Sequence, residues 1–347
     1  MGSRDGNMKA VLYHRTGGPE VLEYTDVADP EPGAKDVIIA VAATALNHLD
    51  IVQRNGWFTM PGFLFPHIAG MDVAGTVVAV GREVERFSVG DRAVVDPSLV
   101  GVPAGSKLAG GDDLFILGAT VDGGYAERCL VPESHVHHVP SSISLEAAAT
   151  FPTCYLTVWH GLFAVGELVA GETVMIHAAG SGIGVAAIHY AKQRGATVIA
   201  TAGSDAKCER ARAIGCDFVC NNRTTDVAAF AREVTDGRGV DMVFDHIGPA
   251  LFEASFYALA TGGRFVTIGN TSGDQLTIPS IGHMYHSGLR ILGSDPYRND
   301  EFAPAWRAFC AGDFDAVIDS EFPLAEAGAA QQKMFTSNFF GKILLRP

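Results

Sequence analysis

The stretch HAAGSGIGVAAI, residues 177–188, constrains the fold more than any other part of this 347-residue chain. It follows an apolar run typical of a buried strand and opens an apolar run typical of a helix. Its glycines allow a sharp turn and a close approach of the backbone to a ligand, and the free N–H groups at the start of the helix bind phosphate. We predict a dinucleotide site formed by Gly180, Ser181, Gly182, Ile183 and Gly184.

The glycine pattern departs from the usual G-x-G-x-x-G fingerprint, because its third position is Val185. The prediction therefore depends on the strand and helix around the turn more than on the pattern itself. A glycine-rich turn that binds nothing is the alternative.

The chain changes character near residue 139. Residues 8–138 hold short β-like runs between Gly, Pro and Asp turns, whereas residues 139–295 alternate apolar strand-like runs with helical ones, which is typical of a parallel sheet. We predict an α/β protein in which a β-rich domain, residues 8–138 completed by 296–347, accompanies a doubly wound cofactor domain, residues 139–295. The expected parallel strands are ETVMIHA, ATVIATA, DFVC, VDMVFDHIG, GGRFVTIGN and LRILGSD.

Charge and composition exclude several classes of function. A net charge of -14 disfavours nucleic acid as a partner, since binding there requires clustered Lys and Arg. No run of about 18 apolar residues predicts a membrane span. The first residues, MGSRDGNMKA, lack the apolar core of a signal peptide, and the six cysteines form no C-x-x-C pair. We expect a cytoplasmic protein without a membrane partner.

The end of the second expected strand, VIATAGSDAK, bears on the choice of cofactor. A carboxylate there would hold the ribose hydroxyl of NAD, whereas this chain has Ser204 and Lys207, a hydroxyl and an ammonium suited to the 2′-phosphate of NADPH. Arg223, after the third strand, is a second candidate for that phosphate. Two alternatives remain: Asp205 near the ribose, or Lys207 as an ordinary surface lysine.

A set of motifs in order resembles the medium-chain dehydrogenase/reductase superfamily over residues 8–347. The motifs are MKAVLYHRTGGPEVL, ALNHLDIVQRNG, PHIAGMDVAGTVVAVG, GDRAVV, GGYAE, AAGSGIG and the terminal GKILL. The resemblance implies a GroES-like catalytic domain, closed by the C-terminal segment, and a Rossmann domain inserted within it.

The resemblance also locates the metal positions of the zinc alcohol dehydrogenases in that superfamily. Their catalytic zinc ligands correspond here to Asn47, Met71 and Thr153, which form no normal zinc site, and Asp72 takes the place of a neighbouring glutamate. The lobe that holds a second zinc in those enzymes corresponds to residues 101–120, which contain no cysteine. A zinc-free protein is therefore expected. The alternative is a metal site rebuilt from His48, His67 and Cys154.

The branch that this chain resembles is that of the zinc-independent quinone oxidoreductases and enoyl reductases. These enzymes pass a hydride from NADPH to a quinone or to the β-carbon of an α,β-unsaturated carbonyl. A conjugated acceptor delocalises the incoming charge onto its own oxygen, so no metal is needed. An alcohol dehydrogenase with an unusual metal site and a non-catalytic dinucleotide-binding protein are the alternatives.

Further site residues follow from the resemblance or from their position. The resemblance places Asn47 and Thr157 beside the nicotinamide, and Gly269 and Asn270 end a strand at the ligand-binding edge of the sheet. His48 and Tyr125 are candidate proton donors, with solvent as an equal alternative, and Lys342 of GKILL is a candidate cofactor contact. We expect an apolar quinone or carbonyl substrate. Six apolar or aromatic side chains are candidates for its pocket, and they are equally candidates for the core or a dimer surface: Trp57, Phe58, Met60, Phe63, Phe65 and Tyr285. The edge strand LRILGSD suggests a homodimer.

Overall fold

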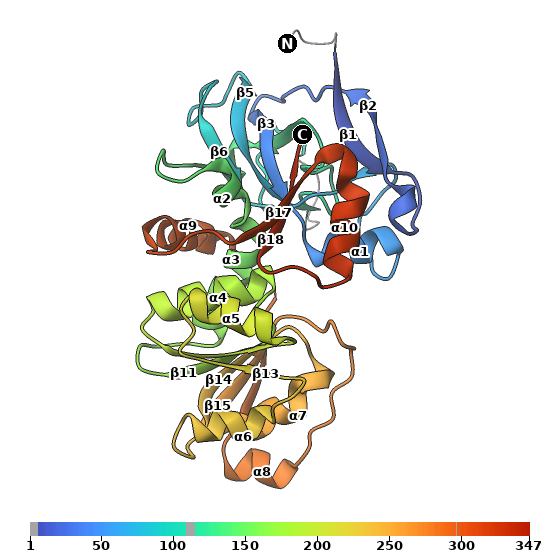
Figure 1. Ribbon diagram of the computed structural model, residues 1–347. Helices are drawn as coiled ribbons and strands as arrows, with labels where there is room; N and C mark the ends of the chain where they lie inside the picture. Colours follow the sequence, from blue (N-terminus) through green and yellow to red (C-terminus); the bar gives the residue numbers. More distant parts are fainter. Residues whose placement is uncertain (1–5, 109–114, 296) are drawn as a thin grey trace. The chain divides into compact units, whose positions relative to one another are not determined.

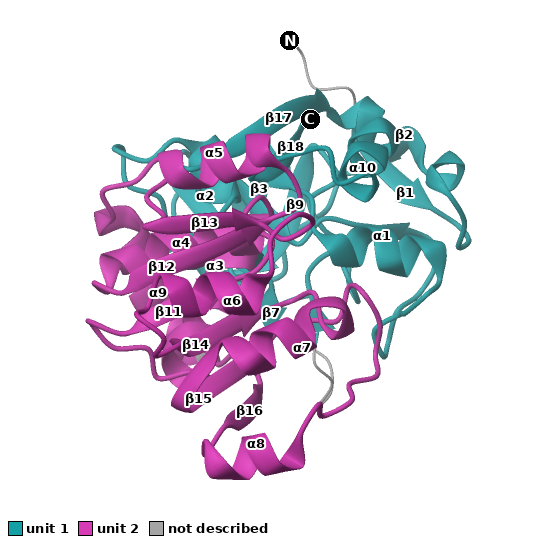
Figure 2. Ribbon diagram, turned by 60° about the horizontal axis from the view of Figure 1, so that its bottom comes forward, with its two compact units in different colours: residues 1–153, 316–347 teal, residues 154–315 magenta. Residues whose placement is uncertain are grey.

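The computed structural model describes residues 6–108, 115–295 and 297–347 (Figure 1). The chain divides into two compact units (Figure 2). Unit 1 combines residues 1–153 with residues 316–347, and unit 2 is the continuous segment 154–315. Both borders lie later in the chain than the predicted ones at 138/139 and 295/296. The described part contains no helix that is long and apolar enough to cross a membrane.

Unit 1 is rich in β-structure, as the sequence predicts. A sheet with the main strand order β10-β6-β5-β3-β18-β17 also pairs β9 with β3, a three-stranded sheet has the order β2-β1-β4, and β7 pairs with β8. The strands are β1 (Asn7–Tyr13), β2 (Glu23–Ala28), β3 (Asp36–Ala45), β4 (His67–Ile68), β5 (Asp72–Val80), β6 (Arg92–Val95), β7 (Ser98–Leu99), β8 (Phe115–Ile116), β9 (Arg128–Pro132), β10 (Val136–His138), β17 (Ile318–Pro323) and β18 (Lys342–Arg346).

The last strand of the chain completes the larger sheet. β18 pairs antiparallel with the end of β3, where Leu344 lies opposite Ala45, and parallel with β17 on its other side. Figure 1 shows this red strand beside the blue β3. The prediction that FGKILLRP returns to the N-terminal β-structure is therefore confirmed.

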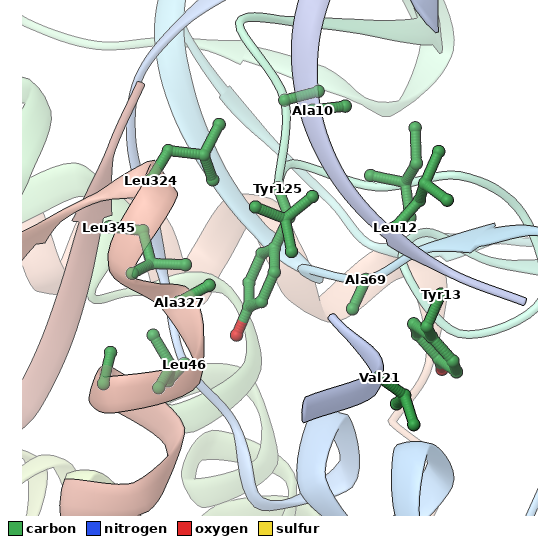
Figure 3. Packing of buried hydrophobic residues seen from close by; sticks show 14 of the residues in the cluster. Ala10, Leu12, Tyr13, Val21, Leu46, Ala69, Tyr125, Leu324, Ala327 and Leu345 are labelled. Atoms are coloured by element: carbon green, nitrogen blue, oxygen red, sulfur yellow. The ribbon is translucent and has the colours of Figure 1, made fainter. Parts of the chain in front are cut away.

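Two apolar clusters form the core of unit 1. One lies among β3, β5, β6 and β9, and the other includes Leu46, Tyr125, Leu324 and Leu345 (Figure 3). The helices that lie wholly within the described part of this unit are α1 (His48–Asn55), α2 (Leu145–Ala149) and α10 (Ala327–Phe335). Figure 3 shows Tyr125 surrounded by apolar side chains of the second cluster.

Unit 2 contains the predicted doubly wound parallel sheet. Its strand order is β13-β12-β11-β14-β15-β16, and all its pairings are parallel. The strands correspond to the six apolar runs: β11 (Thr173–Ile176), β12 (Thr197–Ala202), β13 (Phe218–Asn221), β14 (Val240–Asp245), β15 (Leu259–Thr267) and β16 (Arg290–Gly293). The helices are α3 (Pro152–Trp159), whose first two residues belong to unit 1, α4 (Gly182–Gln193), α5 (Asp205–Ala213), α6 (Val227–Glu233), α7 (Pro249–Ala258), α8 (Ile281–His286) and α9 (Phe302–Ala311).

The strand order fixes where unit 2 can bind a ligand. The chain moves outward from β11 through β12 to β13 and then crosses back to β14 on the other side of β11. The loops after β11 and β14 therefore diverge, and in open parallel sheets the crevice at this reversal is the ligand site. The glycine-rich turn directly follows β11.

Candidate functional site

The glycine-rich turn ends at the N-terminus of α4, as predicted. Ser181 is the N-cap, and its Oγ accepts a hydrogen bond of 2.8 Å from Gly184 N. A Cβ on Gly184 would lie 2.3 Å from the carbonyl oxygen of Ala178, so the turn and the helix approach too closely for a side chain. Ala178 has a φ of 50°, a strained value for a residue with a side chain. This strained, tightly packed turn leaves the first N–H groups of the helix for an anion.

A histidine that the sequence analysis overlooked joins this turn to the next loops. His246 directly follows β14, and its Nε2 lies 3.1 Å from Ser181 Oγ. Its carbonyl oxygen accepts hydrogen bonds from Thr271 N and Oγ1 after β15, and a Cβ on Gly269 would lie 3.4 Å from His246 Cβ. The predicted segments around Gly180 and Gly269 therefore meet through His246. The sequence signal that could have identified His246 is its position directly after β14, the strand at which the strand order reverses.

The end of β12 brings together the residues expected to bind a 2′-phosphate. Ser204 caps α5, so Lys207 lies in the first turn of that helix. A Cβ on Gly203 would lie 3.3 Å from Arg223 Nε, which places the guanidinium against the strand end. This guanidinium has no hydrogen-bond or ion-pair partner among the described residues. The Asp205 carboxylate instead accepts a hydrogen bond of 2.8 Å from Asn221 Nδ2.

In unit 1, the positions that resemble a catalytic metal site form a closed polar network. Asp72 Oδ1 accepts hydrogen bonds from the backbone N of Thr153 at 2.8 Å and from its Oγ1 at 2.6 Å. Asp72 Oδ2 accepts from Asn47 Nδ2 and from Lys342 Nζ, each at 2.9 Å. Lys342 also donates to Asn47 Oδ1 at 2.9 Å and to the carbonyl oxygen of Leu46 at 2.8 Å. Asp72 is completely buried, and Lys342 is 4% exposed.

The proton and charge balance of this network explains how it stays buried. The ammonium of Lys342 has three protons and donates to three acceptors among the described residues, and each Asp72 oxygen accepts two hydrogen bonds there. A buried carboxylate is tolerated when a cation and hydrogen bonds compensate it. The network is therefore neutral, and its carboxylate is saturated with hydrogen bonds. Lys342, the candidate cofactor contact, donates its protons to acceptors within unit 1.

This residue set does not fit zinc. Zinc requires thiolate, imidazole or carboxylate ligands, and Asp72 is the one such group in the network. No cluster of three or more His, Cys, Asp or Glu side chains in the described ranges is placed to hold a metal ion. Of the alternative ligands, His67 Nε2 contacts the carbonyl oxygen of Gly118 at 3.0 Å, His48 is exposed on α1, and Cys154 belongs to unit 2.

The remaining candidate residues lie in different surroundings. Tyr125 is fully buried, and its hydroxyl donates to Asp50 Oδ2 at 3.0 Å. Burial raises the pKa of Tyr125 well above its usual value, and burial also raises the pKa of Asp50 to about 6. This placement argues against Tyr125 as a direct proton donor. Thr157 is half-buried on α3 in unit 2, whereas Asn47 belongs to unit 1.

The aromatic set proposed for a substrate pocket is divided between the two units. Phe63 and Phe65 pack around Tyr13 and His67 in unit 1. The Trp57 side chain is 63% exposed. Tyr285 lies on α8 in unit 2.

Two family models match the chain. The alcohol dehydrogenase GroES-like domain matches residues 33–141, and the zinc-binding dehydrogenase model matches residues 182–311. A quinone oxidoreductase of Pseudomonas aeruginosa is 31% identical, covering 98% of this chain and 99% of its own length. An acryloyl-coenzyme A reductase of Sulfurisphaera tokodaii is 28% identical, with 98% and 100% covered.

Solved structures of proteins similar in sequence have the same fold as this chain. One described as an NAD-dependent alcohol dehydrogenase is 38% identical with a TM-score of 0.90, covering 98% of this chain and all of its own. The quinone oxidoreductase of Escherichia coli, solved with NADPH, is 26% identical with a TM-score of 0.82 at the same coverage. With its GroES-like and Rossmann domains, this chain belongs to the medium-chain dehydrogenase/reductase superfamily, in its quinone oxidoreductase and enoyl reductase-like branch.

Proposed function

We propose that this protein is an NADPH-dependent, zinc-independent oxidoreductase that transfers a hydride to a quinone or to the C=C bond of an α,β-unsaturated carbonyl compound. The observation that carries the proposal is the network around Asp72. Its carboxylate is saturated by Thr153, Asn47 and Lys342, so it has no lone pair directed at a metal. Chemistry that needs no Lewis acid fits such a centre, because a conjugated acceptor carries the developing negative charge on its own oxygen.

The choice of NADPH is supported by the end of β12. Ser204 caps α5 directly after this strand end, Lys207 lies in the first turn of that helix, and the Arg223 guanidinium lies against Gly203. A 2′-phosphate is dianionic and is bound through such donors. Asp205, whose carboxylate would favour the free ribose hydroxyl of NAD, is engaged by Asn221.

The names of the relatives support the acceptor class without deciding it. A quinone and an acryloyl thioester are both conjugated acceptors, and these occur in the names of two relatives that match almost the whole chain. A similar structure is described as an NAD-dependent alcohol dehydrogenase. An alcohol substrate is therefore the second candidate.

In the proposed reaction the dinucleotide supplies the hydride, and the chain supplies binding and orientation. The N-terminus of α4 binds the diphosphate, and the end of β12 binds the 2′-phosphate. The new C–H bond forms at the β-carbon while the π electrons move to the carbonyl oxygen, and solvent supplies the proton that completes reduction. Exposed His48 stays a candidate relay for that proton.

The test is cofactor oxidation by chelator-treated protein, followed through the loss of nicotinamide absorbance. The acceptors are 1,4-benzoquinones, 9,10-phenanthrenequinone, enals, enones and an enoyl thioester, with NADH in parallel. Turnover of a conjugated acceptor with NADPH preferred is expected. Activity confined to alcohols or aldehydes after zinc is added would contradict the proposal, and tight NADPH binding with no turnover in the panel would favour a non-catalytic role.

Assembly and location remain predictions. β16 is an edge strand of the unit 2 sheet, and an edge strand with free N–H and C=O groups can pair with a second copy. We expect a cytoplasmic homodimer that binds neither nucleic acid nor membrane. Sedimentation of the purified protein checks its oligomeric state.

A further inference from the structure

An acid–base pair of unit 2 joins two residues that lie 141 positions apart in the chain, His160 and Glu301. His160 begins the π-helix His160–Val165, which continues α3, and Glu301 directly precedes α9. His160 Nδ1 lies 2.9 Å from Glu301 Oε2 and 3.1 Å from its Oε1, and the two side chains are only 13% and 11% exposed. The pair therefore includes a residue of a π-helix, a rare conformation that occurs frequently at functional sites.

The carboxylate determines which imidazole nitrogen can exchange a proton. An ionised carboxylate only accepts hydrogen bonds, and Glu301 Oε2 accepts a further one from Arg298 N at 2.7 Å. Nδ1 of His160 therefore carries the proton of the pair, which leaves Nε2 as the nitrogen that gains and loses a proton. Nε2 has no hydrogen-bond partner among the described residues. This arrangement is that of a histidine held by a carboxylate for proton transfer.

The residue after His160 locates the pair at the carboxyl edge of the sheet. A Cβ on Gly161 would lie 2.6 Å from Phe244 Cε2 and 3.1 Å from Ile268 Cγ2. Phe244 is the last residue but one of β14, and Ile268 directly follows β15. The π-helix therefore packs against the carboxyl ends of two strands on the β14 side of β11.

The strand order shows which half of a dinucleotide lies at these strand ends. The candidate residues for the 2′-phosphate follow β12 and β13, on the opposite side of β11. A dinucleotide that spans the reversal of strand order then places its adenosine half over β12 and its nicotinamide half on the side of β14. His160 is therefore on the side of the sheet where hydride transfer would occur.

The residues after β16 add two polar groups to the same edge. Ser294 is 5% exposed, and its Oγ has no hydrogen-bond partner among the described residues. Asp295 is exposed; partial desolvation raises the pKa of its carboxyl group, and the charge of His160 opposes that rise. The imidazole thus has one acid bonded to Nδ1 and a second acid nearby that is open to solvent protons.

The proposed reduction needs a proton after the hydride has arrived. Hydride transfer to a conjugated acceptor leaves an anion, which is an enolate when the acceptor is an α,β-unsaturated carbonyl compound. A histidinium can protonate this anion: the Nε2–H bond breaks, its electrons stay on nitrogen, and the proton joins the anion. The neutral imidazole then takes a proton from water and is ready for the next turnover.

We infer that His160 is the general acid that passes solvent protons to the reduced substrate, and that Glu301 is the positioning residue that holds its imidazole. The inference rests on the proposed function, since it requires hydride transfer at this edge of the sheet. It assigns the proton relay to a residue of unit 2 that the sequence analysis did not select.

The experiment compares turnover with cofactor binding in chelator-treated protein. His160→Ala should lower kcat for the best acceptor of the panel about hundredfold or more, the usual contribution of a general acid. The dissociation constant of NADPH, measured by calorimetry, should change less than twofold. Added imidazole should restore part of the lost kcat, because it replaces the missing acid. His286→Ala on exposed α8 should keep its kcat and show no response to imidazole.

Two variants of Glu301 test its positioning role. Glu301→Gln keeps an oxygen that can accept the hydrogen bond from Nδ1, whereas Glu301→Leu removes it. Glu301→Gln should therefore retain more of the kcat than Glu301→Leu, with NADPH binding unchanged in both. Equal kcat values for the two variants would show that Glu301 does not orient the imidazole.

The outcomes separate this inference from the proposed function. If His160→Ala keeps its kcat within twofold of the wild type, or loses kcat without any recovery in imidazole, His160 is not the general acid and the proposed function stands. If wild-type protein reduces no conjugated acceptor of the panel, the proposed function fails, and the inference fails with it.

Discussion

At the scale of single residues, the structure gives ion pairs and unpaired charges different roles. Lys342 and Asp72 lie 270 positions apart in the chain and compensate each other in the interior of unit 1. Arg223 has no partner among the described residues, and it lies at the end of a strand where a ligand charge is expected. The first arrangement is a requirement for folding, whereas the second is available for binding.

Replacing Lys342 by Met should destabilise the protein strongly. The change leaves the Asp72 carboxylate buried without its cation, which typically costs about 3–5 kcal/mol. The free energy of unfolding in urea measures the loss. The double variant Lys342→Met/Asp72→Asn should lose less than the sum of the two single changes, and strict additivity would contradict the ion pair.

Arg223→Ala should raise the KM for NADPH about tenfold or more and leave the KM for NADH nearly unchanged, because NADPH alone carries the 2′-phosphate. Lys207→Ala should act in the same direction. Arg307→Ala, an exposed arginine on α9, is the matched control. An equal rise of both KM values would show that Arg223 does not bind the 2′-phosphate.

The buried carboxyl group of Asp50 predicts how the stability of the protein depends on pH. Burial raises its pKa in the folded protein from an ordinary value near 3.8 to about 6, so the folded state prefers the protonated form and this group destabilises folding as pH rises from 4 to 6. Asp50→Asn removes that dependence. The unfolding free energy of the variant minus that of wild type should therefore increase between pH 4 and 6 and level off above 7; a difference that is flat with pH would contradict the raised pKa.

At the scale of elements, continuous apolar runs made unit 2 predictable. All six expected strands form, because strands buried on both faces need an unbroken apolar sequence, and the glycines after β11 mark the turn into α4. The Asp72 network was predictable only in part, because the resemblance placed Asn47, Thr153 and Asp72 at one former metal site. The contact with Lys342 was not predictable, since this residue comes from a distant segment and a local pattern carries no information on which polar groups meet in the interior.

Gly184→Ala tests how closely β11, its turn and α4 pack. The new Cβ would lie 2.3 Å from the Ala178 carbonyl oxygen, so the turn must move away from its present geometry. We expect at least a tenfold loss of NADPH affinity, measured by calorimetry, because the N–H groups of the helix no longer converge. Gly282→Ala in α8, where the nearest atom would lie 3.8 Å away, should bind NADPH normally.

At the scale of the whole molecule, unit 1 is assembled from both ends of the chain, whereas unit 2 is continuous. The sequence predicted this insertion through the terminal GKILL motif, although the borders of the units lie later than expected. Since β18 stands between β3 and β17, the larger sheet is incomplete until the last residues of the chain are present.

A chain that ends at Gly341 should therefore lose unit 1 while keeping unit 2. The truncation removes β18 together with the ammonium of Lys342. Limited proteolysis should cut residues 1–153 rapidly and leave a fragment close to 154–315, which still binds adenosine 2′,5′-bisphosphate. Resistance of the N-terminal segment equal to that of the full chain would show that β18 is dispensable.

The cation at the centre of unit 1 is part of the polypeptide itself. Lys342 cannot dissociate, exchange with another ion or be removed by a chelator, in contrast to a metal held by side chains. The charge balance of this centre is therefore fixed when the chain is synthesised. The ion pair between Lys342 and Asp72 would therefore form in a cell starved of metal ions as well as in one that has them in excess.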